Sequence, residues 1–88
     1  MTNGTTLIKF YATWCQPCKI LSNTLSKLLP EFPDVTLEEI NIDENVEQSC
    51  EYRVRSIPTV ILIKDGQEVG RLIGNQSTDV LRKFLTNN

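Results

Sequence analysis

The feature that most constrains this chain is a pair of cysteines, Cys15 and Cys18, separated by Gln16 and Pro17. From the first cysteine to about residue 29, apolar residues recur at helical spacing. The spacing predicts a helix over residues 15–29 that buries Cys18 and leaves Cys15, at its tip, nearer solvent. Pro17 falls in the first turn, where its missing N–H costs nothing. Because a helix N-terminus stabilises an anionic sulfur, two thiols placed there predict redox chemistry.

Three other interpretations of the cysteine pair are less favourable. The chain has three cysteines and no histidine, so a closed zinc site of Cys and His ligands would be one ligand short. A structural disulfide across so short a loop would remove little entropy from the unfolded chain. Cysteines that only pack as small apolar side chains are common singly, but less so as a pair flanking a proline. We therefore expect no metal site and no bound cofactor.

Length and charge limit the other functions open to the chain. Its 88 residues are enough for a single domain over 1–88, and its net charge of −2, with both signs interspersed, predicts no binding to nucleic acid or to an anionic membrane. The polar N-terminal residues, followed by only a few apolar ones, predict neither a signal peptide nor a membrane span. An odd number of cysteines without an export signal favours a reducing compartment, so we expect a cytoplasmic location. Without histidine, proton transfer at neutral pH must use lysine, glutamate, aspartate or water.

The remaining segments alternate between strands and helices. Strands are predicted at residues 6–11, 35–42, 59–63 and 68–73, and helices at 43–53 and 77–85 as well as at 15–29. A strand, helix and strand with a crossover of this length form a parallel pair. Glu38 and Glu39 in the second strand are typical of a sheet edge, and Cys50 in the short second helix is expected to be buried. The element order βαβαββα places the chain in the α/β class.

Five sequence motifs together resemble one known family. They are Trp14-Cys15-Gln16-Pro17-Cys18-Lys19, Ile40-Asn41-Ile42-Asp43, Ile57-Pro58-Thr59, Lys64-Asp65-Gly66 and Gly74. In this order and spacing they are similar to thioredoxins over residues 7–85. The resemblance implies a thioredoxin-like fold, in which the four predicted strands form a mixed sheet flanked by helices. Thioredoxins usually begin with a further strand and helix, whereas only 14 residues precede Cys15. We therefore expect a small, glutaredoxin-sized member in which the strand at 35–42 is an edge.

The resemblance also implies a mechanism. Cys15 would attack a target disulfide, and Cys18 would then attack Cys15, release the reduced target and leave an oxidised Cys15–Cys18 pair. The chain would be an enzyme, a protein dithiol–disulfide oxidoreductase that acts as a monomer on disulfide-containing proteins. A thioredoxin reductase or a similar electron donor would regenerate it.

The substrate-binding surface is likewise implied by the family. It would comprise Trp14, Gln16, Pro17, Ile57, Pro58 and Gly74, with Ile57-Pro58 matching the family's cis-proline. Gln16 stands where thioredoxins usually have glycine, at a position that tunes the reduction potential. Taken alone, Trp14 is equally a core aromatic, and Gly74 equally a plain turn residue.

Lys9, in the first predicted strand, departs from the family pattern. Thioredoxins usually have a buried aspartate at this position and a lysine at that of Glu39, so the two charges are exchanged here. An unpaired buried lysine costs several kcal/mol, and an ion pair with Glu39 is therefore expected. The alternative is that Lys9 extends to the surface. On the functional interpretation the pair tunes the acidity of the thiols: Glu39, or Lys9 itself, would help to deprotonate Cys18, or a charged Lys9 would stabilise the thiolate directly.

Two other functions stay open at this point. A glutaredoxin-like enzyme that uses glutathione agrees with the short N-terminal segment, but not with the motifs at residues 14–19 and 57–59. A non-catalytic module would instead bind one partner on the apolar surface around Trp14, and its cysteines would be incidental.

Overall fold

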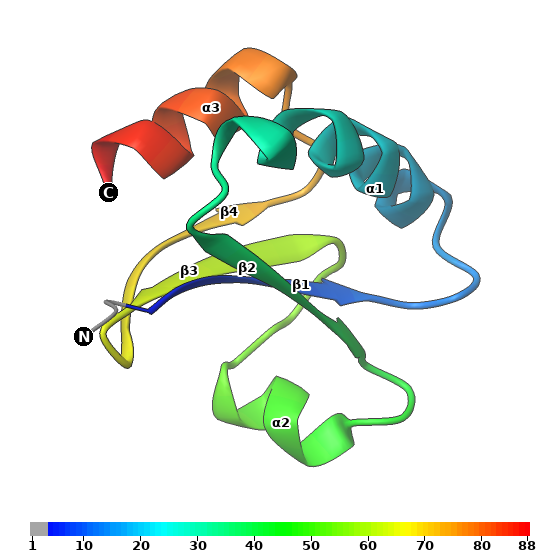
Figure 1. The fold of residues 1–88 in the computed structure, drawn as a ribbon. Helices are drawn as coiled ribbons and strands as arrows, with labels where there is room; N and C mark the ends of the chain where they lie inside the picture. Colours follow the sequence, from blue (N-terminus) through cyan, green and yellow to red (C-terminus); the bar gives the residue numbers. More distant parts are fainter. Residues whose placement is uncertain (1–3) are drawn as a thin grey trace.

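The computed structural model describes residues 4–88, whose strands form a four-stranded sheet in the order β2-β1-β3-β4 (Figure 1). The elements are β1 (Thr5–Tyr11), α1 (Gln16–Leu28), the 3-10 helix η1 (Leu29–Glu31), β2 (Val35–Asn41), α2 (Val46–Glu51), β3 (Thr59–Lys64), β4 (Gln67–Ile73) and α3 (Thr78–Asn87). In Figure 1, α1 and α3 lie over one face of the sheet and α2 lies over the other. The predicted α/β fold and element order are confirmed. Within residues 4–88, no helix is long and apolar enough to cross a membrane.

The inner strand β1 is the one on which the site is built. It pairs in parallel with β2, in a register that sets Lys9 opposite Glu39, and it pairs antiparallel with β3. Because side chains alternate along a strand, Leu7 and Lys9 project toward α1, whereas Ile8 and Phe10 project toward α2. The edge position predicted for β2 is confirmed.

Two apolar layers hold the helices on the sheet. Toward α1 and α3, the core consists of Leu7, Leu21, Leu25, Leu28, Val60, Leu62, Leu81 and Leu85. The layer toward α2 is smaller and consists of Ile8, Phe10, Ile40 and Ile61. Full burial of one such side chain contributes about 1.5–3 kcal/mol. The larger layer therefore anchors α1, and with it both cysteines, against the end of β1.

The start of α1 differs slightly from the prediction. Cys15 is the N-cap rather than the first helical residue, because its backbone is extended while its sulfur accepts a hydrogen bond from the Cys18 N–H. At the other end, Pro30 lies within η1, so the α-helical pattern stops at Leu28 and the chain continues as a single tighter turn. The predicted buried face of the helix is correct, since Cys18 and the leucines of its apolar side are buried.

The prediction that Cys50 is buried is wrong. Cys50 is exposed, and Val46, one turn earlier, is 62% exposed. The six-residue helix α2 buries Ser49 instead, whose hydroxyl donates to the Asn45 carbonyl oxygen at 2.9 Å. Apolar cover for this face of the sheet comes after the helix, where the Tyr52 ring packs on the core. A helix of fewer than two turns has too little periodicity to indicate which of its sides faces the sheet.

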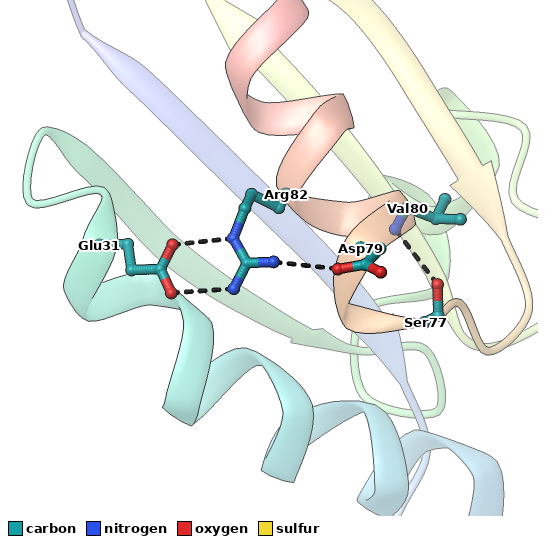
Figure 2. Close-up of polar contacts among 5 residues, drawn as sticks. All are labelled: Glu31, Ser77, Asp79, Val80 and Arg82. Atoms are coloured by element: carbon teal, nitrogen blue, oxygen red, sulfur yellow. Dashed lines mark hydrogen bonds and ion pairs between the residues drawn. The ribbon is translucent and has the colours of Figure 1, made fainter.

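The last helix is fixed by a cap and by an ion pair with a distant part of the chain (Figure 2). Ser77 Oγ accepts a hydrogen bond from the Val80 N–H at 3.2 Å, as expected of an N-cap serine. Arg82 donates to both carboxylate oxygens of Glu31, at 2.9 and 3.0 Å, and to Asp79 at 3.1 Å. The hydrogen bonds from Arg82 hold the pKa of Glu31 below its ordinary value of 4.5. The Glu31–Arg82 pair links η1 to α3.

Candidate active site

The cysteine pair lies where β1 ends and α1 begins. Cys15 and Cys18 are joined by a disulfide, with their Cα atoms 5.3 Å apart. The Cys15 N–H donates to the Ala12 carbonyl oxygen at 3.2 Å, which closes the turn between strand and helix. With Ala12, the two cysteines form a buried cluster against which Ile42 and Ile57 pack. Among residues 4–88, no group of three or more His, Cys, Asp or Glu side chains is placed to hold a metal ion.

Cys15 stands at the positive end of α1. Its sulfur accepts the Cys18 N–H at 3.2 Å, and the first turn of the helix contains no acidic residue. A backbone N–H donor and the helix dipole both favour an anionic sulfur over a thiol. The Cys15 sulfur therefore has surroundings of the kind that favour a thiolate, which makes it the candidate for the attacking sulfur.

Exposure does not distinguish the two sulfurs, contrary to the expectation that Cys15 lies nearer solvent. Cys15 is 4% exposed and Cys18 is 2% exposed. The Cys15 side chain turns back over the helix to serve as its cap, so it packs inward instead of projecting from the tip. The feature that distinguishes the two sulfurs is the hydrogen bond that Cys15 Sγ accepts from the Cys18 N–H.

Trp14 is 68% exposed, so the alternative of a core aromatic is wrong. Its Nε1 donates to Asp43 Oδ2 at 2.9 Å, and the Asp43 N–H donates to Asn41 Oδ1 at 2.9 Å. These contacts satisfy the polar edge of the indole and leave an apolar ring toward solvent. Asp43 was not predicted to belong to the site. The signal that could have identified it is the parallel pairing of β1 with β2, which brings the ends of the two strands together.

Three of the predicted substrate-binding residues, Ile57, Pro58 and Gly74, are connected to one another, and Ile57 packs beside the cysteines. The Ile57–Pro58 peptide bond is cis, and Ile57 packs on the cysteine cluster. The Gly74 N–H donates to the Pro58 carbonyl oxygen at 2.8 Å, and Gly74 has a φ of +84°, a backbone conformation that favours glycine. Gln16 and Pro17 are exposed in the first turn of α1.

A groove of about 370 Å³ adjoins Trp14 and Ile57. Its other apolar lining includes Ile42 and Val54, and the free thiol of Cys50 also lines it. Gln16, Pro17, Pro58 and Gly74 are not among its lining residues. The exposure of Cys50 on this groove is a second feature that the sequence did not predict.

Lys9 and Glu39 form the ion pair that their positions in the sequence predict. Lys9 is 2% exposed, and its Nζ lies 2.8 Å from Glu39 Oε2. It also donates to Ser22 Oγ and lies 5.3 Å from the centroid of the Tyr11 ring. The alternative, in which Lys9 extends to the surface, is wrong. Lys9 and Glu39 line a second hollow, of about 390 Å³, together with Cys18.

Comparisons with known proteins agree with this architecture. The family model described as Thioredoxin matches residues 1–87. A thioredoxin from Chlamydia pneumoniae is 46% identical over 87 residues, which cover 99% of this chain and 81% of that protein. A thioredoxin from Staphylococcus aureus is 37% identical over 84 residues, which cover 94% of this chain and 81% of that protein. The crystal structure of oxidised mitochondrial thioredoxin 3 from Saccharomyces cerevisiae has a TM-score of 0.90 and 38% identity, and the match covers 98% of this chain and 80% of that one.

These similarities extend through the segment that holds the two cysteines, and the structure joins the same two residues in a disulfide. The chain therefore belongs to the thioredoxin family, and it is a thiol–disulfide oxidoreductase whose redox pair is Cys15 and Cys18.

Proposed function

We propose that Cys15 is the attacking thiol and Cys18 the resolving thiol in the reduction of protein disulfides. The observation that supports this assignment is the hydrogen bond from the Cys18 N–H to the Cys15 sulfur at 3.2 Å. A fixed backbone donor favours the thiolate, and the thiolate is the form that attacks a disulfide. Cys18, one turn further along α1, is then placed to attack Cys15.

The reaction consists of two exchanges. In the first, the Cys15 thiolate attacks one sulfur of the target disulfide, a Cys15–target bond forms, and the second target sulfur leaves as a thiolate and takes a proton. In the second, the Cys18 thiol loses its proton to water, and its thiolate attacks the Cys15 sulfur. The Cys15–target bond breaks, and the remaining target sulfur also takes a proton. The dithiol has then supplied the two electrons that reduce the target.

The proposed substrate surface surrounds the cysteine pair. Trp14 supplies an exposed apolar ring, and Ile57 supplies an apolar wall against the cysteines. The family resemblance implies that the backbone at Ile57-Pro58 pairs with an extended substrate, with Gly74 on the neighbouring loop. Gln16 and Pro17 border the approach to Cys15 from the start of α1.

The proposed electron donor is a thioredoxin reductase, because members of this family are generally reduced by one. A dithiol that must be reduced again after each cycle, together with a free exposed Cys50, suits a reducing compartment. This supports the cytoplasm as the location. A monomer is proposed because the substrate surface has to be accessible.

Turnover of a model protein disulfide tests the proposed function. The chain should reduce the disulfide when thioredoxin reductase and its reductant are supplied, and should do so poorly when glutathione is the only donor. Turnover that needs glutathione would favour a glutaredoxin-like enzyme, and no turnover with either donor would favour a binding module.

The order of attack is tested by trapping. Cys18→Ser should accumulate a covalent complex with the model protein disulfide, which a small dithiol then releases. Cys15→Ser, the matched control, should form no such complex. A stable complex with Cys15→Ser, and none with Cys18→Ser, would reverse the two roles.

A further inference from the structure

A buried lysine, Lys9, lines the same hollow as the resolving cysteine. Lys9 faces α1 from an inner strand, and its side chain is 2% exposed. Its Nζ contacts Glu39 on β2 at 2.8 Å, Ser22 on α1, and the ring of Tyr11. A charge is retained in such a place only when its contacts compensate for the lost hydration. The fold therefore provides a specific position for one positive charge.

The Lys9 ammonium can accommodate one further acceptor. An ammonium has three N–H donors, and the contacts with Glu39 and Ser22 occupy two of them. The Tyr11 ring attracts the charge through its face but is not a conventional acceptor. A third N–H is thus available to an anion or a water molecule beside Lys9.

The hollow next to Lys9 is lined by Cys18, the proposed resolving cysteine, but not by Cys15, the proposed attacking cysteine. Cys18 lines it with Lys9, Tyr11, Ser22 and Glu39, and its volume of about 390 Å³ has room for several water molecules. Cys15 is not among the lining residues. An electrostatic effect transmitted through this hollow would therefore act on Cys18 more than on Cys15.

We propose that Lys9 is a positioning residue that stabilises the Cys18 thiolate during the second exchange. The inference rests on the proposed function and concerns its second step. Cys18 releases its proton to water in the hollow, and the thiolate forms near the Lys9 ammonium. The thiolate then bonds to the Cys15 sulfur as the Cys15–target bond breaks, and the departing target sulfur takes a proton from solvent.

The other charged groups that face the hollow act more weakly than Lys9. The titratable side chains in its lining are Lys9 and Tyr11 from β1, Cys18 and Lys19 from α1, and Glu39 from β2. Lys19 is exposed and Glu39 is 47% exposed, so water and salt screen both of them. Glu39 thus compensates Lys9 from the solvent side, while the buried ammonium is less screened by bulk water and salt than either of the exposed groups.

The test measures the rate of the second exchange, in which Cys18 attacks Cys15. The substrate is an aromatic disulfide that releases a coloured thiolate, and all variants carry Cys50→Ser. The first thiolate released reports attack by Cys15, and the second reports attack by Cys18. Lys9→Met should move the pH profile of the second release about 1 unit toward alkaline pH, with a loss of about tenfold in rate below the midpoint. The first release should change little. Lys9→Arg should retain the wild-type profile, because it keeps the charge.

A second measurement uses only the chain itself. In a glutathione redox buffer, Lys9→Met should be harder to reduce than wild type, because the reduced form loses a contact that stabilises its thiolate. The equilibrium constant should differ by up to about tenfold at alkaline pH, equivalent to about 30 mV, and the difference should vanish in acid, where both thiols are protonated. Lys27→Met, which removes an exposed charge at the far end of α1, should match wild type at every pH.

Two results would overturn the proposal. An unchanged resolution profile and redox equilibrium in Lys9→Met would show that the cation does not act on Cys18. A rate of the second thiolate release that Lys9→Met lowers by the same factor at every pH would indicate that Lys9 has a structural role only. Lys9→Gln, which can still bond Glu39, gives the same expected shifts if Lys9→Met does not fold. If Lys9→Met shows the expected shifts in both assays but the wild-type chain does not turn over protein disulfides, the proposed function fails, while the effect of Lys9 on the Cys18 thiolate stands.

Discussion

The Trp14 indole donates a hydrogen bond to Asp43 Oδ2 at 2.9 Å, although the two residues are 29 positions apart in the sequence. The contact joins the loop after β1 to the loop after β2, at the ends of two parallel strands. It orients a ring that is 68% exposed. An apolar side chain held in this way is already ordered when a substrate arrives, so less conformational entropy is lost on binding.

Removal of this hydrogen bond should weaken substrate binding. A single hydrogen bond of this kind contributes about 1 kcal/mol, so Asp43→Ala should raise the KM for a protein disulfide several-fold and change kcat little. Trp14 is the only tryptophan of the chain, so its fluorescence reports the loosened ring directly. Glu44→Ala, an exposed neighbour, is the control. Unchanged KM and fluorescence in Asp43→Ala would show that the contact does not organise the surface.

Alkylation of the reduced protein should label Cys15 before Cys18. The N-cap hydrogen bond and the helix dipole favour the Cys15 thiolate, which is the form that reacts with an alkylating reagent. The exposed Cys50 would react as well, so the experiment needs a Cys50→Ser background and identification of the labelled peptide. Faster labelling of Cys18 at near-neutral pH would reverse the assignment.

Substitution of Cys50 should leave catalysis nearly intact. Cys50 lies on α2 and lines the groove beside Trp14, but its thiol is free and takes no part in the redox disulfide. Cys50→Ser should therefore keep kcat within about twofold of wild type, with at most a small change in KM, since surface changes of this kind have small effects. A large loss of kcat in a folded Cys50→Ser variant would assign Cys50 a catalytic role.

Patterns over many residues were sufficient to predict the fold. The apolar spacing along α1, the continuous apolar run of β3 and the Asp65-Gly66 turn each indicate one element, and the crossover from β1 to β2 requires parallel strands. These signals are local or follow from general chain geometry. α2 is too short for such a signal. The burial of Ser49 and the exposure of Cys50 therefore emerged only once the helix was packed on the sheet.

Parts of the active site could not be predicted for a related reason. The cysteine pair and Pro17 lie in one short segment, so their chemistry is visible in the sequence. The contact of Trp14 with Asp43 depends on the strand register and on two loop conformations, which no local pattern encodes. The inward turn of the Cys15 side chain depends on its role as an N-cap. This role requires one particular side-chain conformation, which the sequence pattern does not specify. Burial of the Cys15 sulfur was missed for that reason.

The Lys9–Glu39 pair should show strong energetic coupling. Glu39→Gln leaves the buried Lys9 without its ionic partner, so we expect a loss of about 1–3 kcal/mol in the free energy of unfolding. Lys9→Met should cost much less, because Glu39 is 47% exposed and can be hydrated. The double variant should resemble Lys9→Met alone. Urea unfolding of the oxidised proteins provides the measurement, and strictly additive effects of the two substitutions would show that the residues are not coupled.

The Glu31–Arg82 ion pair should make the stability of the chain depend on pH in acid. The hydrogen bonds from Arg82 lower the pKa of Glu31 from its ordinary value of 4.5 in the folded state. A carboxyl group whose pKa is lower when folded stabilises the protein above its unfolded pKa, and this contribution is lost as the pH falls through the folded pKa. The difference in unfolding free energy between wild type and Arg82→Met should thus be constant from neutral pH to about pH 5 and should shrink as the pH falls further.

The control for this experiment is Lys83→Met, which removes an exposed positive charge from the adjacent position of α3. Arg71 lowers the pKa of Glu68 on β4 in the same way, so the wild-type chain also loses stability in acid through that pair. Arg82→Met retains the Glu68–Arg71 pair, so the difference between Arg82→Met and wild type excludes that pair and contains only the contacts of Arg82 with Glu31 and Asp79. Urea unfolding at a series of pH values measures this difference. If the difference stays constant from neutral pH to well below the ordinary carboxyl pKa, the charge of Glu31 does not contribute to the link between η1 and α3.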